Sequence, residues 1–120
     1  MQYSGLHNYC KSKKGCQHEF KTEWGVDRYM LSGKMFAMIG GDKAGKPIIT
    51  LKGSPMENLA LRENFSDIIP GYYMNKEHWN SIYLEGHVPD DLIKKMIDAS
   101  YHLVFSGLSK KLQKEIETSS

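Results

Sequence analysis

A chain of 120 residues is long enough for one hydrophobic core but not for two that would each be stable, so we expect a single domain over residues 1–120. With 40% hydrophobic and 25% charged residues and a net charge of +2, the composition excludes a disordered chain. No apolar run approaches the roughly 18 residues of a membrane span, and Met1–Gly5 lacks a signal-peptide pattern. We therefore expect a cytoplasmic protein that does not enter a membrane.

The first predicted element is an amphipathic helix from about Ser4 to Lys14. Apolar residues recur at helical spacing between Tyr3 and Cys10, and Gly15 is placed to end the helix. Its polar positions carry no acid but three lysines, namely Lys11, Lys13 and Lys14.

Three strands in a meander are predicted next. Val26–Leu31 and Lys34–Ile39 flank Ser32-Gly33, a two-residue connection typical of a hairpin. The third strand is Pro47–Lys52, in which Ile49 and Leu51 would share one face.

A short helix from Pro55 to about Asn64 is indicated by the capping box that Ser54 and Glu57 complete. Ile68–Gly71 is then expected to interrupt regular secondary structure. Tyr72–Met74 is expected to be extended, and Asn75 is expected to cap a turn. A further strand is predicted over Trp79–Leu84.

The longest predicted helix begins at Pro89 and ends at Gly107, with an apolar stripe that faces the core. Ser109 can cap a last short helix, and residues 117–120 are expected to fray. Strands in a run between helices predict an α+β two-layer sandwich, with an antiparallel sheet of about four to five strands and helices on one face.

Several separated motifs resemble the MmcQ/YjbR family. The sheet signature is Ser32–Met38, and the most distinctive motif is Ile69–Asn80. Pro89–Leu92 and Ala99–Tyr101 resemble the terminal helix, and Leu108–Lys111 resembles the tail, where the family more often has proline in place of Ser109. The resemblance runs from about Leu6 to Lys114.

This resemblance implies a frataxin-like (CyaY-like) fold, also described as a double wing, and the label of a predicted DNA-binding protein. It implies no catalytic residue and no cofactor. Iron handling on a frataxin fold uses an acidic first helix, whereas the first helix here carries lysines, so we expect no iron binding by that route.

Charge is unevenly distributed along the chain. Lysine and arginine outnumber acids from Met1 to Lys52, and acids outnumber them from Gly53 to Gly107. Such polarity can attract an anionic partner. We expect DNA or another nucleic acid to contact Lys11, Lys13, Lys14, Lys34, Lys52, Lys76 and His78, although exposed lysines also serve solubility alone.

Aromatic residues crowd the segment after Gly71. Tyr72, Tyr73 and Trp79 could stack on unpaired bases or line a small pocket. Alternatively, Trp79 and Tyr73 plug the end of the sandwich and His78 holds the turn. The alternative to nucleic-acid binding is a protein-interaction module that uses a sheet face or edge, or this aromatic segment.

Catalysis and metal binding have little support in the sequence. No nucleophile elbow or phosphate loop is present, so we expect no enzyme. Cys10 and Cys16 lie six residues apart, which differs from zinc-ligand spacing, although His7 and His18 flank them.

Overall fold

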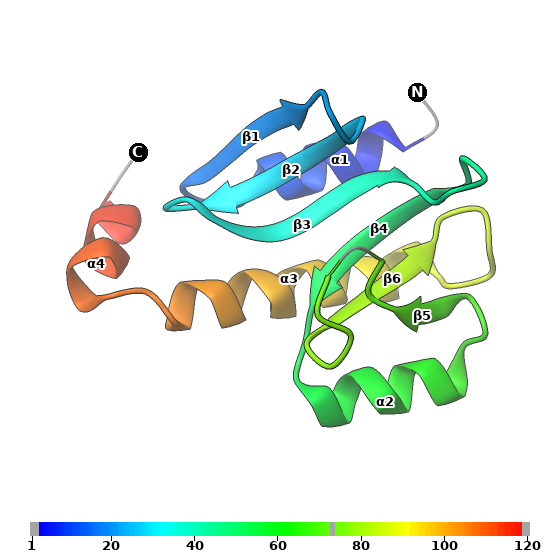
Figure 1. Ribbon diagram of the computed structural model, residues 1–120. Coiled ribbons are helices and arrows are strands. Elements are labelled where there is room, and N and C mark those ends of the chain that lie inside the picture. Colours follow the sequence, from blue (N-terminus) through cyan, green and yellow to red (C-terminus); the bar gives the residue numbers. More distant parts are fainter. Residues whose placement is uncertain (1–2, 73, 119–120) are drawn as a thin grey trace.

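The computed structural model describes residues 3–72 and 74–118 as a sheet and four helices (Figure 1). The strands are β1 Cys16–Lys21, β2 Val26–Leu31, β3 Lys34–Gly41, β4 Pro47–Lys52, β5 Ile68–Pro70 and β6 Trp79–Tyr83. The helices are α1 Ser4–Lys11, α2 Pro55–Asn64, α3 Asp90–Ser106 and α4 Lys110–Thr118.

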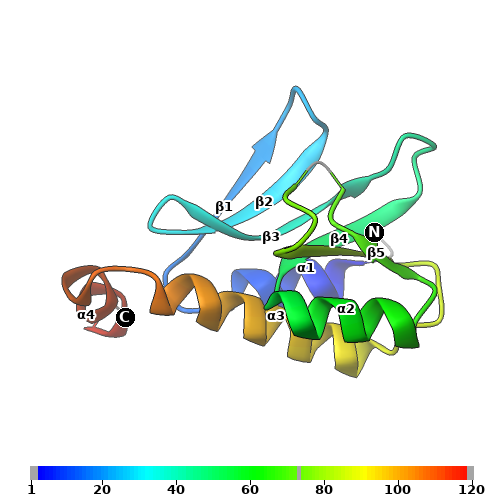
Figure 2. The ribbon, with the colours of Figure 1, turned by 60° about the horizontal axis from the view of Figure 1, so that its bottom comes forward.

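The sheet is antiparallel throughout, in the order β1-β2-β3-β4-β6-β5. Helices α1, α2 and α3 cover one face, and α4 lies beyond the end of α3 (Figure 2). The predicted α+β architecture with helices on one face is therefore confirmed.

The predicted number of four to five strands is wrong, because the sheet formed by the described residues has six. The two strands without a predicted counterpart, β1 and β5, are its edges. β1 buries no residue fully, so it has no clear alternation of apolar and polar side chains. β5 has only three residues and ends at Pro70, which cannot donate a ladder hydrogen bond.

Local signals place most of the other boundaries. Ser32 and Gly33 adopt φ values of 49° and 79°, as a two-residue hairpin turn of this type requires. Ser54 Oγ accepts the Glu57 N–H at 3.4 Å and caps α2. The Ser109 hydroxyl likewise accepts the Leu112 N–H at 3.2 Å at the start of α4.

Several bounds differ from the prediction, and three of the differences are larger than a shift of one or two residues at a strand end or fall on residues named above. α1 ends at Lys11 rather than near Lys14. Tyr72 lies in a turn rather than in an extended stretch, and Tyr73 lies outside the described residues. At the C-terminal end α4 continues to Thr118, so residues 117 and 118 are helical and not frayed, whereas residues 119 and 120 lie outside the described residues.

Gly15 suits the short connection between α1 and β1, where the chain is closely packed and turns sharply. Its φ is +79°, and a Cβ there would lie 3.1 Å from side-chain atoms of both Ile116 and Leu31. A larger residue would therefore be strained in its backbone and crowded by α4.

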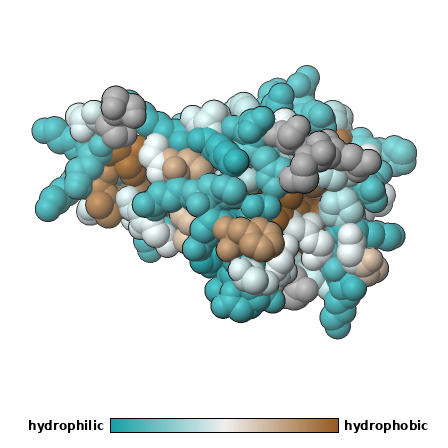
Figure 3. Space-filling view, turned by 90° about the horizontal axis from the view of Figure 1, so that it is seen from above, coloured by the Kyte–Doolittle hydropathy of each residue, from teal (hydrophilic) through white to brown (hydrophobic). Residues whose placement is uncertain are grey.

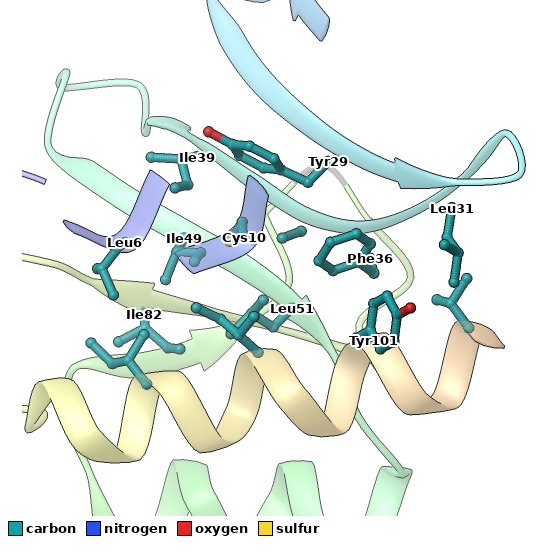
Figure 4. Packing of buried hydrophobic residues seen from close by; sticks show 14 of the residues in the cluster. Leu6, Cys10, Tyr29, Leu31, Phe36, Ile39, Ile49, Leu51, Ile82 and Tyr101 are labelled. Carbon is teal, nitrogen blue, oxygen red and sulfur yellow. The ribbon is translucent and has the colours of Figure 1, made fainter. Parts of the chain in front are cut away.

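The core lies between the sheet and α3 (Figure 4). Tyr29, Leu31, Phe36, Ile49, Leu51 and Ile82 project from the strands and are almost completely buried. Phe36 meets Tyr101 of α3 edge to face, with ring centroids 5.4 Å apart. Burial of each large apolar side chain contributes about 1.5–3 kcal/mol, which makes this layer the main source of stability.

The helix-free face of the sheet is covered in its middle by residues 71–72 and 74–78, which we call the covering segment (Figures 1 and 2). Ser81 accepts the Tyr72 N–H at 2.9 Å and pairs with the Thr50 hydroxyl at 2.7 Å. The Tyr72 hydroxyl in turn accepts the Lys43 N–H at 2.9 Å. These bonds explain why polar Thr50 and Ser81 are fully buried on this face.

Candidate functional site

Lysines gather at one end of the molecule, which we call the basic end. Antiparallel pairing places the start of β1, the β2–β3 turn, the end of β4 and the start of β6 together there. α3 ends and α4 lies at the same end (Figure 1). The lysines are Lys11, Lys13, Lys14, Lys34, Lys52, Lys76, Lys110, Lys111 and Lys114, and the acids are Glu57, Glu77, Asp98, Glu115 and Glu117.

The opposite end, which we call the acidic end, has the reverse balance. It carries the β1–β2 turn, the β3–β4 loop, the α2–β5 connection and the start of α3. Its acids are Glu23, Asp42, Glu63, Asp67, Glu85, Asp90 and Asp91, and its lysines are Lys21, Lys43, Lys46 and Lys94. The molecule therefore has a charge polarity along the strand direction.

The predicted lysines share the basic end but not one face. Lys34 pairs with Leu31, whose side chain is in the core. The Lys34 side chain therefore leaves the sheet on its helix-covered face. Lys52 pairs with Trp79 on the helix-free side. The predicted common surface is thus a curved end that includes both faces.

Two of the three α1-proximal lysines have partners. Lys13 forms an ion pair with Asp98 of α3. Burial alone would lower the pKa of Lys13, but the hydrogen bonds to Asp98 and Tyr9 outweigh it and raise that pKa. Lys14 Nζ donates to the Glu117 carbonyl at 2.7 Å, whereas Lys11 is exposed at the end of α1.

Lys76 and His78 lie in the covering segment. Lys76 Nζ donates to the Gly71 carbonyl at 3.2 Å. His78 has an exposed side chain, while its carbonyl accepts the Gly53 N–H at 2.9 Å and its N–H donates to Asn75 Oδ1. Asn75 thus caps this turn as predicted, and the His78 imidazole is directed to solvent at the basic end.

The predicted aromatic residues are placed differently from one another. Trp79 is only 8% exposed and lies on the helix-free side of the sheet, so its ring is not available to stack on a base. Tyr72 is half-buried and holds the β3–β4 loop through its hydroxyl. Tyr73 lies outside the described residues.

A polar network that the sequence reasoning missed fixes the covering segment. Arg62 of α2 donates to Asn80 Oδ1 at 2.6 Å and to the carbonyls of Lys76 and Trp79. The buried Asn58 amide donates to the carbonyls of Gly53 and Glu77. Only the position of Asn80 at the end of the Ile69–Asn80 motif pointed toward this arrangement.

The cysteines and histidines near α1 form a packed cluster. His18 stacks on Tyr29 at 4.8 Å and bonds Asp27 at 2.7 Å. Burial raises the pKa of Cys10 to about 12 and that of Cys16 to about 11, so both thiols are protonated at neutral pH. Among the described residues, no group of three His, Cys, Asp or Glu is arranged to hold a metal ion.

Membrane insertion by a helix has no support in the structure. Within residues 3–72 and 74–118, no helix combines the length and apolar character that crossing a bilayer requires.

Two proteins of Escherichia coli are similar in sequence to most of this chain. The chain is 32% identical to the YjbR protein of Escherichia coli K12 over 114 residues, covering 95% of this chain and 96% of that protein. It is 37% identical to the YbdF protein of Escherichia coli O157:H7 over 90 residues, covering 75% of this chain and 73% of that protein.

Solved structures share the fold. A crystal structure of the Deinococcus radiodurans protein DR2400 matches with a TM-score of 0.85 and 25% identity, covering 97% of this chain and 88% of that chain. A crystal structure from Pseudomonas syringae matches with a TM-score of 0.74 and 23% identity, covering 86% of this chain and 98% of that chain. The family model described as YjbR matches residues 11–103. The chain belongs to the YjbR family.

Proposed function

We propose that the protein binds nucleic acid through its basic end, without a catalytic step. The observation that supports this proposal is the gathering of lysines from α1, the β2–β3 turn, β4, the covering segment and α4 at one end of the sheet. The acidic end would turn away from a phosphate backbone, so the charge polarity would orient the bound molecule.

The basic end offers contacts of the kind that phosphates need. Lys11, Lys34 and Lys76 have exposed side chains, as do the lysines of α4. Lysine ammonium groups contact phosphates as point charges and read no sequence. We therefore expect binding that has little sequence preference and an affinity that depends strongly on salt concentration.

Fluorescence anisotropy with labelled short duplex and single-stranded DNA, measured over a salt series, tests the proposal. Each neutralised phosphate contributes about 0.9 to the log–log salt slope on duplex DNA. The double variant Lys34→Glu with Lys111→Glu should reduce both the affinity and this slope. The matched control is Lys43→Glu with Lys46→Glu, which makes the same charge change at the acidic end and should retain the slope.

Two outcomes count against nucleic-acid binding. One is an absence of binding at low salt, and the other is binding whose strength does not depend on salt. An equal loss in both double variants would show that net charge, and not the basic end, is responsible.

A protein-interaction role is the second candidate, and the open edge at β1 favours it. Phe20 is 57% exposed on this strand and Trp24 is 51% exposed in the following turn. Figure 3 shows hydrophobic residues only in separate patches on a mostly hydrophilic surface in this view. A Phe20→Ser variant should lose partner binding or self-association measured by sedimentation velocity, whereas Leu59→Ser, which changes an exposed leucine of α2, should retain it.

A further inference from the structure

β1 is an edge strand that lacks the usual barriers to further pairing. It forms one border of the sheet, and no described strand pairs with its outer side (Figure 1). It has six residues, contains no proline and pairs with β2 without a register shift. The opposite edge strand, β5, has only three residues and ends at Pro70. The backbone N–H and C=O groups along the outer side of a strand such as β1 are available to another strand.

The middle of β1 is exposed to solvent. The exposed residues are Gln17, His18, Glu19 and Phe20, and the Phe20 side chain is 57% exposed. The β1–β2 hairpin rises away from α2 and α3 (Figure 2). A strand from another molecule can therefore approach β1 in the plane of the sheet.

Two opposite charges share one face of β1. Glu19 pairs with Arg28 of β2, and Lys21 pairs with Val26. Because Arg28 and Val26 alternate along β2 with the core residue Tyr29, both charged side chains of β1 lie on the helix-free face. Charges on an edge strand usually discourage pairing. Opposite charges two residues apart, however, complement an identical strand that runs antiparallel.

We propose that β1 pairs with β1 of a second copy of this chain, antiparallel and centred on Phe20. A two-fold axis perpendicular to the sheet joins the two sheets into one and keeps both helix layers on the same side. Glu19 then lies opposite Lys21 of the second copy, and the reciprocal pair forms across the axis. The two Phe20 rings meet at the centre on the other face, where an aromatic cross-strand pair stabilises the contact.

Charge favours this register over its neighbours. Because the axis keeps each face of the sheet on one side, the centre of the contact must fall on a residue and not between two. A centre on Glu19 or on Lys21 would set two like charges directly opposite each other, which is unfavourable. A centre on Gln17 or His18 would face neither charge with an opposite one within β1.

Contacts within one copy already hold the two charged side chains. Glu19 Oε1 forms an ion pair with Arg28, and Glu19 is 50% exposed, so its carboxylate can accept a second cation. Lys21 Nζ lies 4.7 Å from the centre of the Trp24 ring. Side chains that are ordered before association lose less conformational entropy when they meet a partner.

The proposed contact is small. A single pair of six-residue strands buries less than the roughly 1,200–2,000 Å² of a stable specific interface, so we expect a reversible dimer at high protein concentration. The proposal rests on the interaction role of β1, given above as the second candidate function, and names its partner. Lys34 and Lys111, which represent the basic end in the DNA-binding test, lie outside this contact, so nucleic-acid binding does not depend on it.

Reciprocal charge reversal tests both the partner and the register. Glu19→Lys sets an ammonium group opposite Lys21 of the second copy, and Lys21→Glu sets a carboxylate opposite Glu19. Each variant alone should self-associate at least about fourfold more weakly than the unaltered protein, measured by sedimentation velocity over a concentration series. An equimolar mixture of the two variants should associate again, because the charges across the axis are then opposite.

The matched controls make the same charge changes away from β1. Glu63→Lys on α2 and Lys43→Glu in the β3–β4 loop alter exposed side chains, and each should self-associate as the unaltered protein does. Thermal unfolding shows whether each variant is folded. This matters most for Glu19→Lys, which also removes the ion pair with Arg28.

Four results would overturn the proposal. The first is an unaltered protein that stays monomeric over the whole concentration series. The second is a mixture of Glu19→Lys and Lys21→Glu that associates no more strongly than either variant alone. The third is equal self-association of the β1 variants and the controls. The fourth is loss of binding to a different protein in Phe20→Ser while the unaltered protein is monomeric, which would keep the interaction role of β1 but reject the second copy as its partner.

Discussion

At the scale of single residues, Ser100 joins three elements. It is fully buried on α3, donates its hydroxyl to the Phe36 carbonyl at 2.6 Å and accepts the Lys52 N–H at 2.9 Å. The hydroxyl thus satisfies backbone groups of β3 and β4 near the basic end, where the two strands no longer bond each other.

Ser100→Ala should lower the free energy of unfolding by about 1–3 kcal/mol, because a buried N–H and a buried carbonyl lose their partner. Urea denaturation measures this change. Ser106→Ala, on the exposed end of the same helix, is the matched control and should change stability by less than about 0.5 kcal/mol. Equal stability of the two variants would show that Ser100 does not bridge the strands.

His7 couples stability to pH. Burial lowers the pKa of His7 below its ordinary value of 6.5, and its Nδ1 bonds the hydroxyl of the buried Tyr29. Because the folded-state pKa is the lower one, the unfolded chain binds the proton more readily. The contribution of His7 to stability is therefore complete above pH 6.5 and is lost as the pH falls from 6.5 to the folded-state pKa.

His7→Gln should flatten the pH dependence of unfolding in that window, because glutamine takes up no proton. Urea denaturation of both proteins at several pH values on either side of 6.5 measures the effect. An unchanged pH dependence in the variant would mean that other groups account for the acid sensitivity.

At the scale of elements, α2 holds the covering segment in place. Arg62 binds the carbonyls of Lys76 and Trp79, and Asn58 binds that of Glu77. The covering segment in turn places Lys76 and His78 at the basic end. Order in this segment therefore depends on a helix that touches the sheet on its other face.

Arg62→Met should keep the aliphatic stem and remove these hydrogen bonds. We expect a loss of about 1–3 kcal/mol in stability and faster amide exchange at Glu77 and His78 than in the unaltered protein. Glu63→Met, at the exposed neighbouring position of α2, is the control. Unchanged amide exchange at Glu77 and His78 would show that Arg62 does not hold the covering segment in place.

Elements with local chemical signals could be predicted from the sequence. The capping box at Ser54 defines α2, and the Ser32-Gly33 turn sets the β2–β3 hairpin, because each depends on residues close in the chain. β1 and β5 could not be found in this way. Their strand conformation depends on pairing with β2 and β6, and their own residues show little periodicity.

The candidate site was only partly predictable for the same reason. The lysines near α1 and in the family-like motifs could be named, but not their partners. Lys13 pairs with Asp98, which is 85 positions away in the chain, and Lys14 binds the backbone of α4. That the lysines of α4 lie at the basic end becomes visible only when distant elements are brought together.

At the scale of the whole molecule, antiparallel pairing of the strands places most lysines at one end of the sheet and most acids at the other, although the charge asymmetry along the sequence is weak. The net charge is only +2, yet lysines dominate one end and acids dominate the other. A polyanion should therefore approach the basic end even though the protein as a whole is nearly neutral.

Chemical-shift mapping of the ¹⁵N-labelled protein with a short DNA duplex at low salt tests this orientation most directly. The account predicts that the shifted amides lie around Lys34, Lys76 and His78 and along α4, and that they return to their free positions as salt is added. Shifts centred on the β3–β4 loop and the start of α3, or no shifts at any salt concentration, would contradict it.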